Sequence, residues 1–205
     1  MIQPDYVITH LRGIWQLIVG RKNWRADMDI SVDGVFRSLW ALALSTPIAI
    51  IAAIATQNLQ ALVPESTDAI KITAPLPVSI FAMLVSLAVT WFGVLAGLVA
   101  VTRGMNATHA AGPLIITYNW SQLLSFLAFM APISVFAITQ SAEAFVLSAL
   151  PVAIFELVIL WNIIRRILPI GVGGAIALML GVLVGEQIIG SLVHDSVISL
   201  YGALS

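Results

Sequence analysis

The sequence predicts an all-α protein, a polytopic transmembrane helical bundle of five spans. Three observations lead to this prediction: 60% of the 205 residues are hydrophobic, only 9% are charged, and the apolar residues gather in long stretches. A soluble domain carries about 25% charged residues, so a surface this poor in charge suits lipid. Transmembrane strands would instead give segments of about ten residues with alternating polarity.

Five stretches are long enough to cross a bilayer, whose hydrocarbon core needs roughly 20 mainly apolar residues per helix. They are Val35–Thr56, Pro77–Val101, Leu114–Thr139, Ala144–Ile164 and Pro169–Leu192. We therefore expect a cytoplasmic N-terminal segment over residues 1–34 and a five-helix transmembrane domain over residues 35–205. The N-terminal segment lacks the apolar core and cleavage site of a removable signal peptide, so the first span is expected to act as an uncleaved insertion signal.

Basic residues predict the orientation, because cytoplasmic joints are enriched in Lys and Arg. One set of alternate joints carries eight of the nine basic residues: Arg12, Arg21, Lys22, Arg25, Arg37, Arg103, Arg165 and Arg166. The other set has only Lys71, beside Glu65 and Asp68. This asymmetry predicts a cytoplasmic N-terminus and an external C-terminus.

Residues 5–20 carry an apolar face at helical spacing, formed by Val7, Leu11, Ile14, Trp15 and Ile18. The pattern predicts an amphipathic helix that either lies along the inner membrane surface or packs beneath the bundle. Two basic groups on the same side of the membrane are expected to contact anionic lipid headgroups. They are Arg21, Lys22 and Arg25 after this helix, and Arg165 and Arg166 after the fourth span. Either Ser31 or Asp33 is a suitable cap for the first span.

Tryptophans mark the expected inner boundaries of the spans. Five of the six fall near these boundaries, as in an interfacial aromatic belt: Trp15, Trp24, Trp40, Trp120 and Trp161. Two of them adjoin an asparagine, Asn119 in one case and Asn162 in the other. These amide–indole pairs either anchor the helices or form a binding patch on the cytoplasmic rim.

Small residues predict where helices approach one another. In the fifth span they recur every fourth position, and the second span has a shorter series. The predicted ridge residues are Gly173, Ala177, Gly181, Gly185, Gly93 and Gly97. Such ridges allow close helix contact where apolar burial no longer drives association. They can serve packing within the bundle, packing against another subunit, or the lining of a pathway.

Glu156 and Glu186 are the only acidic residues well inside a predicted span. A charge near the bilayer centre costs about 2.5–3.5 kcal/mol on insertion scales and is a functional hypothesis by default. At 1.5 Å per residue from the inner edge, Glu156 is roughly 13 Å deep and Glu186 roughly 25 Å deep, too far apart to share a proton or a metal. They could be two stations on an ion path, hydrogen-bonding groups within the bundle, or contacts to a partner helix. Possible polar partners are Thr90, Ser121, Gln122 and Asn162.

Several kinds of site are excluded or disfavoured. The chain has no cysteine, which excludes disulfides, thiolate metal sites and cysteine nucleophiles. Two histidines, His10 and His109, are predicted on the inner side and His194 on the outer side, so they cannot share a metal. The zinc-protease, nucleophile-elbow and P-loop motifs do not occur. We expect no enzyme, no cofactor and no nucleic-acid partner. The expected partners are the lipid bilayer and either further copies of the chain or a larger membrane-protein complex.

A cytoplasmic N-terminal segment followed by five spans, with little mass outside, resembles the Yip family of five-span, Rab-interacting membrane proteins and their bacterial relatives. The resemblance is architectural and covers most of the chain. The Asp-Leu-Tyr-Gly-Pro pattern of the eukaryotic members is missing before the first span, and Leu200-Tyr201-Gly202 occurs only at the other end. The resemblance implies a scaffold or membrane-organising protein, which in a bacterium would lie in the inner membrane.

Two functions remain as hypotheses. The first is a non-enzymatic scaffold, membrane-organising protein or accessory subunit of a membrane complex that acts through helix contacts. The second is a small transporter or channel that uses Glu156 and Glu186 for proton or cation coupling. Pro47, Pro132 and Pro151, each inside a predicted span, would then act as hinges.

Overall fold

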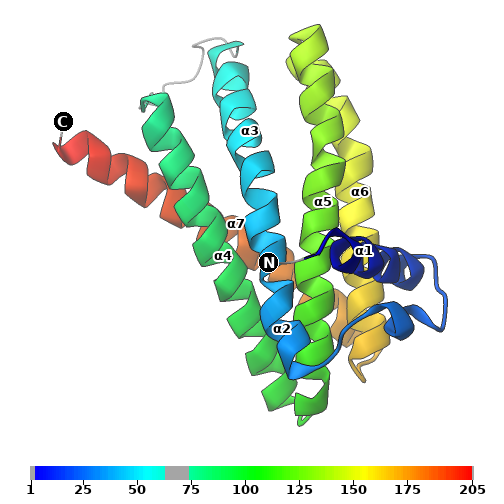
Figure 1. Ribbon diagram of the computed structural model, residues 1–205. Helices are drawn as coiled ribbons and strands as arrows, with labels where there is room; N and C mark the ends of the chain where they lie inside the picture. Colours follow the sequence, from blue (N-terminus) through cyan, green and yellow to red (C-terminus); the bar gives the residue numbers. More distant parts are fainter. Residues whose placement is uncertain (1–2, 63–73, 205) are drawn as a thin grey trace.

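The computed structural model describes residues 3–62 and 74–204, and all regular secondary structure in these ranges is helical. In chain order the elements of Figure 1 are α1 (Pro4–Ile18), η1 (Trp24–Asp27), α2 (Val32–Ser38), α3 (Trp40–Leu62), α4 (Leu76–Gly104), η2 (Thr108–Ala110), α5 (Ala111–Thr139), α6 (Ala142–Ile167) and α7 (Val172–Leu204). Five helical segments are long and apolar enough to cross a membrane. The predicted fold class, an all-α bundle with five candidate spans, is confirmed.

The orientation of the bundle stays a prediction, because helix length and composition do not distinguish the two sides of a membrane. Three of the residues on which it rests, Lys71, Glu65 and Asp68, lie outside the described residues.

The predicted spans differ from the observed helices at the two ends of the domain. The first, Val35–Thr56, is divided between α2 and α3, which meet at Leu39. The fifth, Pro169–Leu192, is displaced, because α7 begins at Val172 and continues to Leu204. Apolar composition ends near Leu192, but no proline follows it, so nothing interrupts the helix hydrogen bonds there.

Helix α5 is the centre of the bundle. It packs against α1, α2, α3, α4 and α6, and every residue from Ile116 to Ser121 is buried. Helix α7 packs against α4 and α6 and runs obliquely to the other long helices (Figure 1). This tilt decides which side chains of α7 reach the interior of the bundle.

The predicted amphipathic helix is present as α1, which crosses α5 and α6 on one side of the bundle (Figure 1). Gly13, Ile14 and Leu17 are buried on its inner face. Ile8 and Trp15 are exposed on its outer face. Of the two predicted settings for this helix, packing against the bundle is therefore observed, and contact with the membrane surface stays a prediction.

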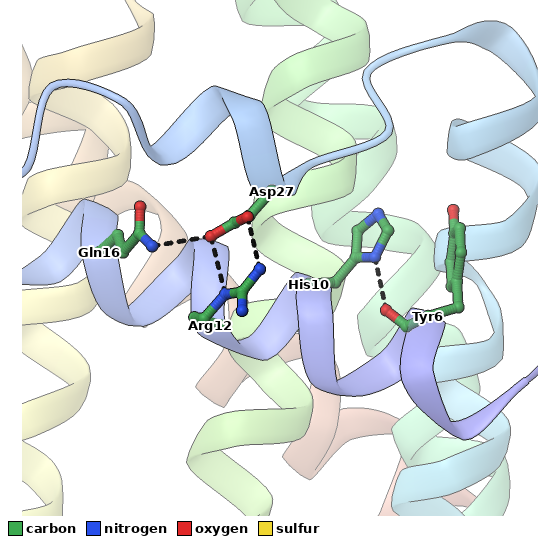
Figure 2. A network of polar contacts seen from close by, with 5 residues as sticks. All are labelled: Tyr6, His10, Arg12, Gln16 and Asp27. Carbon is green, nitrogen blue, oxygen red and sulfur yellow. Dashed lines mark hydrogen bonds and ion pairs between the residues drawn. The ribbon is translucent and has the colours of Figure 1, made fainter.

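Polar contacts fold the following segment back onto α1 (Figure 2). Asp27 accepts hydrogen bonds from Arg12 Nη2 at 2.8 Å, Arg12 Nε at 3.0 Å and Gln16 Nε2 at 2.7 Å. His10 Nδ1 lies 2.7 Å from the Tyr6 carbonyl oxygen, and its Nε2 accepts a hydrogen bond of 3.0 Å from the Asp29 backbone N–H. Because a carbonyl only accepts, these partners assign the proton to Nδ1 and make the ring neutral.

The chain between Asp29 and Gly34 joins this N-terminal segment, formed by α1 and η1, to the first span. Ser31 Oγ accepts the Gly34 N–H at 3.0 Å, which confirms Ser31 as the helix cap, and donates to Asp29 Oδ1 at 2.6 Å. A Cβ atom on Gly34 would collide with the carbonyl oxygen of Asp29. The close approach of the two backbones therefore requires glycine at this position.

Only part of the predicted aromatic belt is free to meet lipid. Trp15 and Trp40 are about half exposed, whereas Trp24 and Trp120 are buried within the protein. The Trp120 ring packs against those of Tyr6 and His10, with centroid distances of 6.0 and 5.1 Å. Asn119 is also fully buried, so it does not belong to a binding patch on the rim.

The buried His10 predicts that the contact between α1 and the Asp29 backbone depends on pH. Burial lowers the pKa of the His10 imidazole below its ordinary value of 6.5. The neutral form therefore stabilises the contact between His10 and Asp29 above pH 6.5, and this contribution to stability is lost as the pH falls below that value. We expect the protection of the Asp29 amide against hydrogen exchange, corrected for the intrinsic rate, to be constant above about pH 6.5 and to fall as the pH is lowered further.

Asp27 and Asp29 titrate well below this pH, because hydrogen bonds from Arg12 and Ser31 respectively lower the pKa values of their carboxyls. The control is His10→Gln, whose side-chain oxygen can still accept the Asp29 N–H but does not titrate. Equal pH dependence in this variant would remove His10 as the cause.

Candidate functional site

The two glutamates within the candidate spans come together in the structure. Glu156 of α6 and Glu186 of α7 line the same small cavity, of about 50 Å³, between α5, α6 and α7. A polar cavity of this size is large enough to hold water. The two carboxyls therefore belong to one site.

Depth counted along the sequence placed Glu156 and Glu186 too far apart to share a proton or a metal, whereas in the structure both residues line one cavity. That count assumed that both helices stand upright and that the fifth span begins at Pro169. Helix α7 begins three residues later and runs obliquely (Figure 1). Each of its residues therefore gains less depth than the 1.5 Å of an upright helix, so Glu186 can reach the cavity that Glu156 lines.

Tyr118 of α5 holds Glu186 in place. The phenol hydroxyl donates a hydrogen bond of 2.7 Å to Glu186 Oε1, and the Tyr118 side chain is almost completely buried. Of the residues in the described ranges, only Tyr118 forms a side-chain hydrogen bond with this carboxyl. Trp91 packs edge-on against the Tyr118 ring at a centroid distance of 6.3 Å, which restricts the phenol to this position.

A polar stripe on α5 forms one wall of the small cavity. Tyr118, Ser121, Gln122 and Ser125 all line it, at the i, i+3, i+4 and i+7 spacing of one helix face. Of these residues, Ser121 and Gln122 were predicted as possible partners of the glutamates, and Tyr118 and Ser125 were missed. The spacing of the four was visible in the sequence and is the signal that could have found them.

Glu156 differs from Glu186 in its exposure. Glu156 is exposed on the surface of α6, whereas Glu186 is partly buried between α5 and α7. The neighbours Ile154 and Leu157 on α6 are also exposed, as on a face that meets lipid. Glu156 therefore stands at the edge of the cavity and Glu186 deeper within it.

A second, larger cavity of about 550 Å³ lies on the other side of Glu186, between α3, α4, α5 and α7. Tyr118, Gln122 and Glu186 line both cavities. Along α7 the larger cavity continues to His194 and Asp195. The two cavities thus meet at the Tyr118–Glu186 hydrogen bond.

The predicted ridge residues of α4 and α7 line an apolar crevice. Gly93, Gly97, Gly181 and Gly185 border this space of about 300 Å³ between the two helices. A Cβ atom added at Gly97, Gly181 or Gly185 would meet no atom within 4 Å. At Gly93, by contrast, an added Cβ would lie 3.1 Å from Ile189 Cδ1 of α7, and further along Ser86 Oγ donates a 2.8 Å hydrogen bond to the Gly190 carbonyl. Gly173 and Ala177 are exposed on α7.

The predicted lipid-contacting cations lie on the surface in two neighbouring groups. The side chains of Arg21, Lys22, Arg25, Arg165 and Arg166 are all exposed. The two groups approach each other, because a Cβ on Gly20 would lie 3.1 Å from Arg166 Nη2. Their contact with anionic lipid stays a prediction.

The described residues contain no group of three or more His, Asp or Glu side chains that could hold a metal ion. The chemistry available at the site is that of two carboxyls, a phenol and several hydroxyl and amide groups, which can pass protons or bind cations. Comparison with protein-family models, with curated proteins and with solved structures gives no match to this chain. Fold and site together describe a helical bundle with five candidate membrane spans and carboxyl-lined cavities.

The shared cavity can be tested by cross-linking, because the chain has no cysteine of its own. We expect the variant carrying Glu156→Cys and Glu186→Cys to form an intramolecular product with a short bifunctional thiol reagent, as measured by mass spectrometry of the digested protein. The matched control pairs Glu156→Cys with Val184→Cys, whose native side chain is 54% exposed on another face of α7. Equal yields from the two pairs would contradict the shared cavity.

Proposed function

We propose that the protein is a small membrane transporter or channel that couples to protons or cations through Glu156 and Glu186. The observation that supports this function best is that two carboxyls from different helices line one cavity within the candidate spans. Ionisable groups at membrane depth usually face a cavity or the bundle interior and mark ion or proton pathways. We further propose a bacterial inner membrane as its location.

Titratable groups form a series through the bundle. From Glu156 at the surface of α6 the series runs to Tyr118 and Glu186, and the larger cavity continues it to His194 and Asp195. Asp195 follows Glu186 by nine positions along α7, which is about 13 Å along the helix. A phenol both donates and accepts hydrogen bonds, so Tyr118 can pass a proton to or from the carboxyl that it contacts.

The test is flux in reconstituted vesicles. We expect Glu156→Gln and Glu186→Gln each to reduce proton or cation flux to the level of protein-free vesicles, because an amide neither releases a proton nor carries the charge that pairs with a cation. The matched control is Glu143→Gln at the start of α6, which removes an exposed carboxyl outside both cavities. Full flux in the Glu156→Gln variant would exclude Glu156 as a proton- or cation-binding group on the pathway.

A second candidate function is that of a scaffold or accessory subunit, which is the function implied by the resemblance to bacterial relatives of the Yip family. The crevice between α4 and α7 favours it, because Gly97, Gly181 and Gly185 lie there without a side chain of this chain packed against them. We propose that a transmembrane helix of a second copy of the chain fills this space. Small residues on both walls allow such close contact.

This candidate predicts a crevice-dependent dimer. Native mass spectrometry in mild detergent should show a dimer for the natural chain and a monomer for Gly181→Leu, whose side chain would fill the crevice. Gly202→Leu, near the end of α7 and away from the crevice, is the control. A natural chain that stays monomeric without any partner would count against a contact function.

A further inference from the structure

We infer that the larger cavity between α3, α4, α5 and α7 binds a small organic cation, with Glu186 as its counter-ion. The inference rests on the proposed function and names the class of substrate. The cavity volume of about 550 Å³ falls within the range typical of sites for small organic molecules, roughly 300–1,000 Å³. It is far larger than the shell of a bare metal ion.

The charge of the lining selects for cations. Glu186 and Asp195 line the cavity, and its described lining includes His194 but no lysine or arginine. An anion would find no fixed positive partner here. A cation can pair with Glu186, whose Oε1 already receives the Tyr118 hydroxyl and is thereby held in place.

Aromatic rings provide the second element of recognition. Trp91, Tyr118 and Phe126 all line the cavity. The rings of Trp91 and Phe126 are nearly parallel, 22° apart, with centroids 6.5 Å from each other. Trp91 Nε1 donates a 2.8 Å hydrogen bond to Asn119 Oδ1, which fixes the indole. Ring faces attract ammonium groups, and clustered aromatic rings are a typical element of quaternary ammonium recognition.

Apolar groups line the rest of the cavity and favour an organic cation over an inorganic one. Met83, Leu87 and Ala49 contribute hydrocarbon to the walls. Thr90 also lines the cavity, and its Oγ1 is buried with no hydrogen-bond partner among the described residues. A ligand that has both an ammonium group and a hydrogen-bond donor would satisfy Glu186 and Thr90 together.

The test uses the full chain in lipid nanodiscs with radiolabelled benzyltrimethylammonium as the probe. Its uncharged isostere, neopentylbenzene, has carbon in place of nitrogen and serves as the competitor. We expect saturable binding above protein-free discs and poor competition by the isostere. Effective competition by the isostere, or no saturable binding, would overturn the inference.

Two variants separate the roles of charge and ring. Glu186→Gln should weaken binding by about ten- to a hundredfold, because the partly buried ionic partner of the cation is lost. Phe126→Leu keeps an apolar side chain and should weaken binding by about two- to fivefold. Glu143→Gln, outside the cavity, should bind as the natural chain does. Unchanged affinity in a folded Glu186→Gln protein would overturn the assignment of the counter-ion.

A measurement on the natural chain supplements the variants. Binding should weaken as the pH is lowered, because a protonated carboxyl no longer pairs with a cation. The titratable groups that face Glu186 are Tyr118 from α5, Glu156 from α6, and His194 and Asp195 of α7 itself; α3 and α4 add none to the described lining. Affinity that does not change with pH would contradict the inference.

Binding and flux together distinguish the inference from the function on which it rests. Ammonium binding without any flux of the probe, protons or inorganic cations would support the cavity assignment and overturn transport. Proton flux that depends on Glu156, without ammonium binding, would overturn the cavity assignment and leave the proposed function in place.

Discussion

The packing of the bundle depends on the need of polar groups in an apolar interior to find partners within the protein. Helix α5 supplies most of these partners. Asn119 is fully buried, accepts a hydrogen bond from Trp91 at 2.8 Å, and donates one to Ser38 Oγ at 2.7 Å, so it joins α2, α4 and α5. One residue earlier, Tyr118 joins α5 to α7 through Glu186. Two adjacent side chains thereby fix three other helices around α5.

Long apolar stretches were sufficient to predict the five candidate spans, because crossing a bilayer requires a minimum apolar length. The same reasoning could not predict helix tilt, which is set by side-chain packing. The error for Glu186 follows directly, since depth was counted along an upright helix. The division of the first span at Leu39 was equally hidden, because no proline or glycine lies between Val35 and Thr46 to mark it. Ser31, by contrast, was predicted as a cap from local chemistry alone, and local chemistry decides a cap.

The site was only partly predictable for a related reason. A carboxyl within an apolar stretch is conspicuous, so Glu156 and Glu186 were found. A tyrosine or a serine in a transmembrane helix is common, and whether it faces the interior depends on how the helix is rotated. Trp120 shows that a tryptophan near the end of an apolar stretch need not lie at the membrane interface. It lies near the start of an apolar stretch, as an interfacial tryptophan would, yet α1 folds back and covers it with Tyr6 and His10.

The contact between Gly34 and Asp29 has a mechanical consequence. The backbone of residues 29–34 forms a short, hydrogen-bonded connection between the N-terminal helix α1 and the first candidate span. Ser31 Oγ bonds to both Asp29 and Gly34, and no side chain separates Gly34 from the Asp29 carbonyl. The Asp29 N–H at one end of this connection is also the group that His10 accepts. The N-terminal end of α2 is therefore tied to α1, so a displacement of the first candidate span would be transmitted to the N-terminal helix.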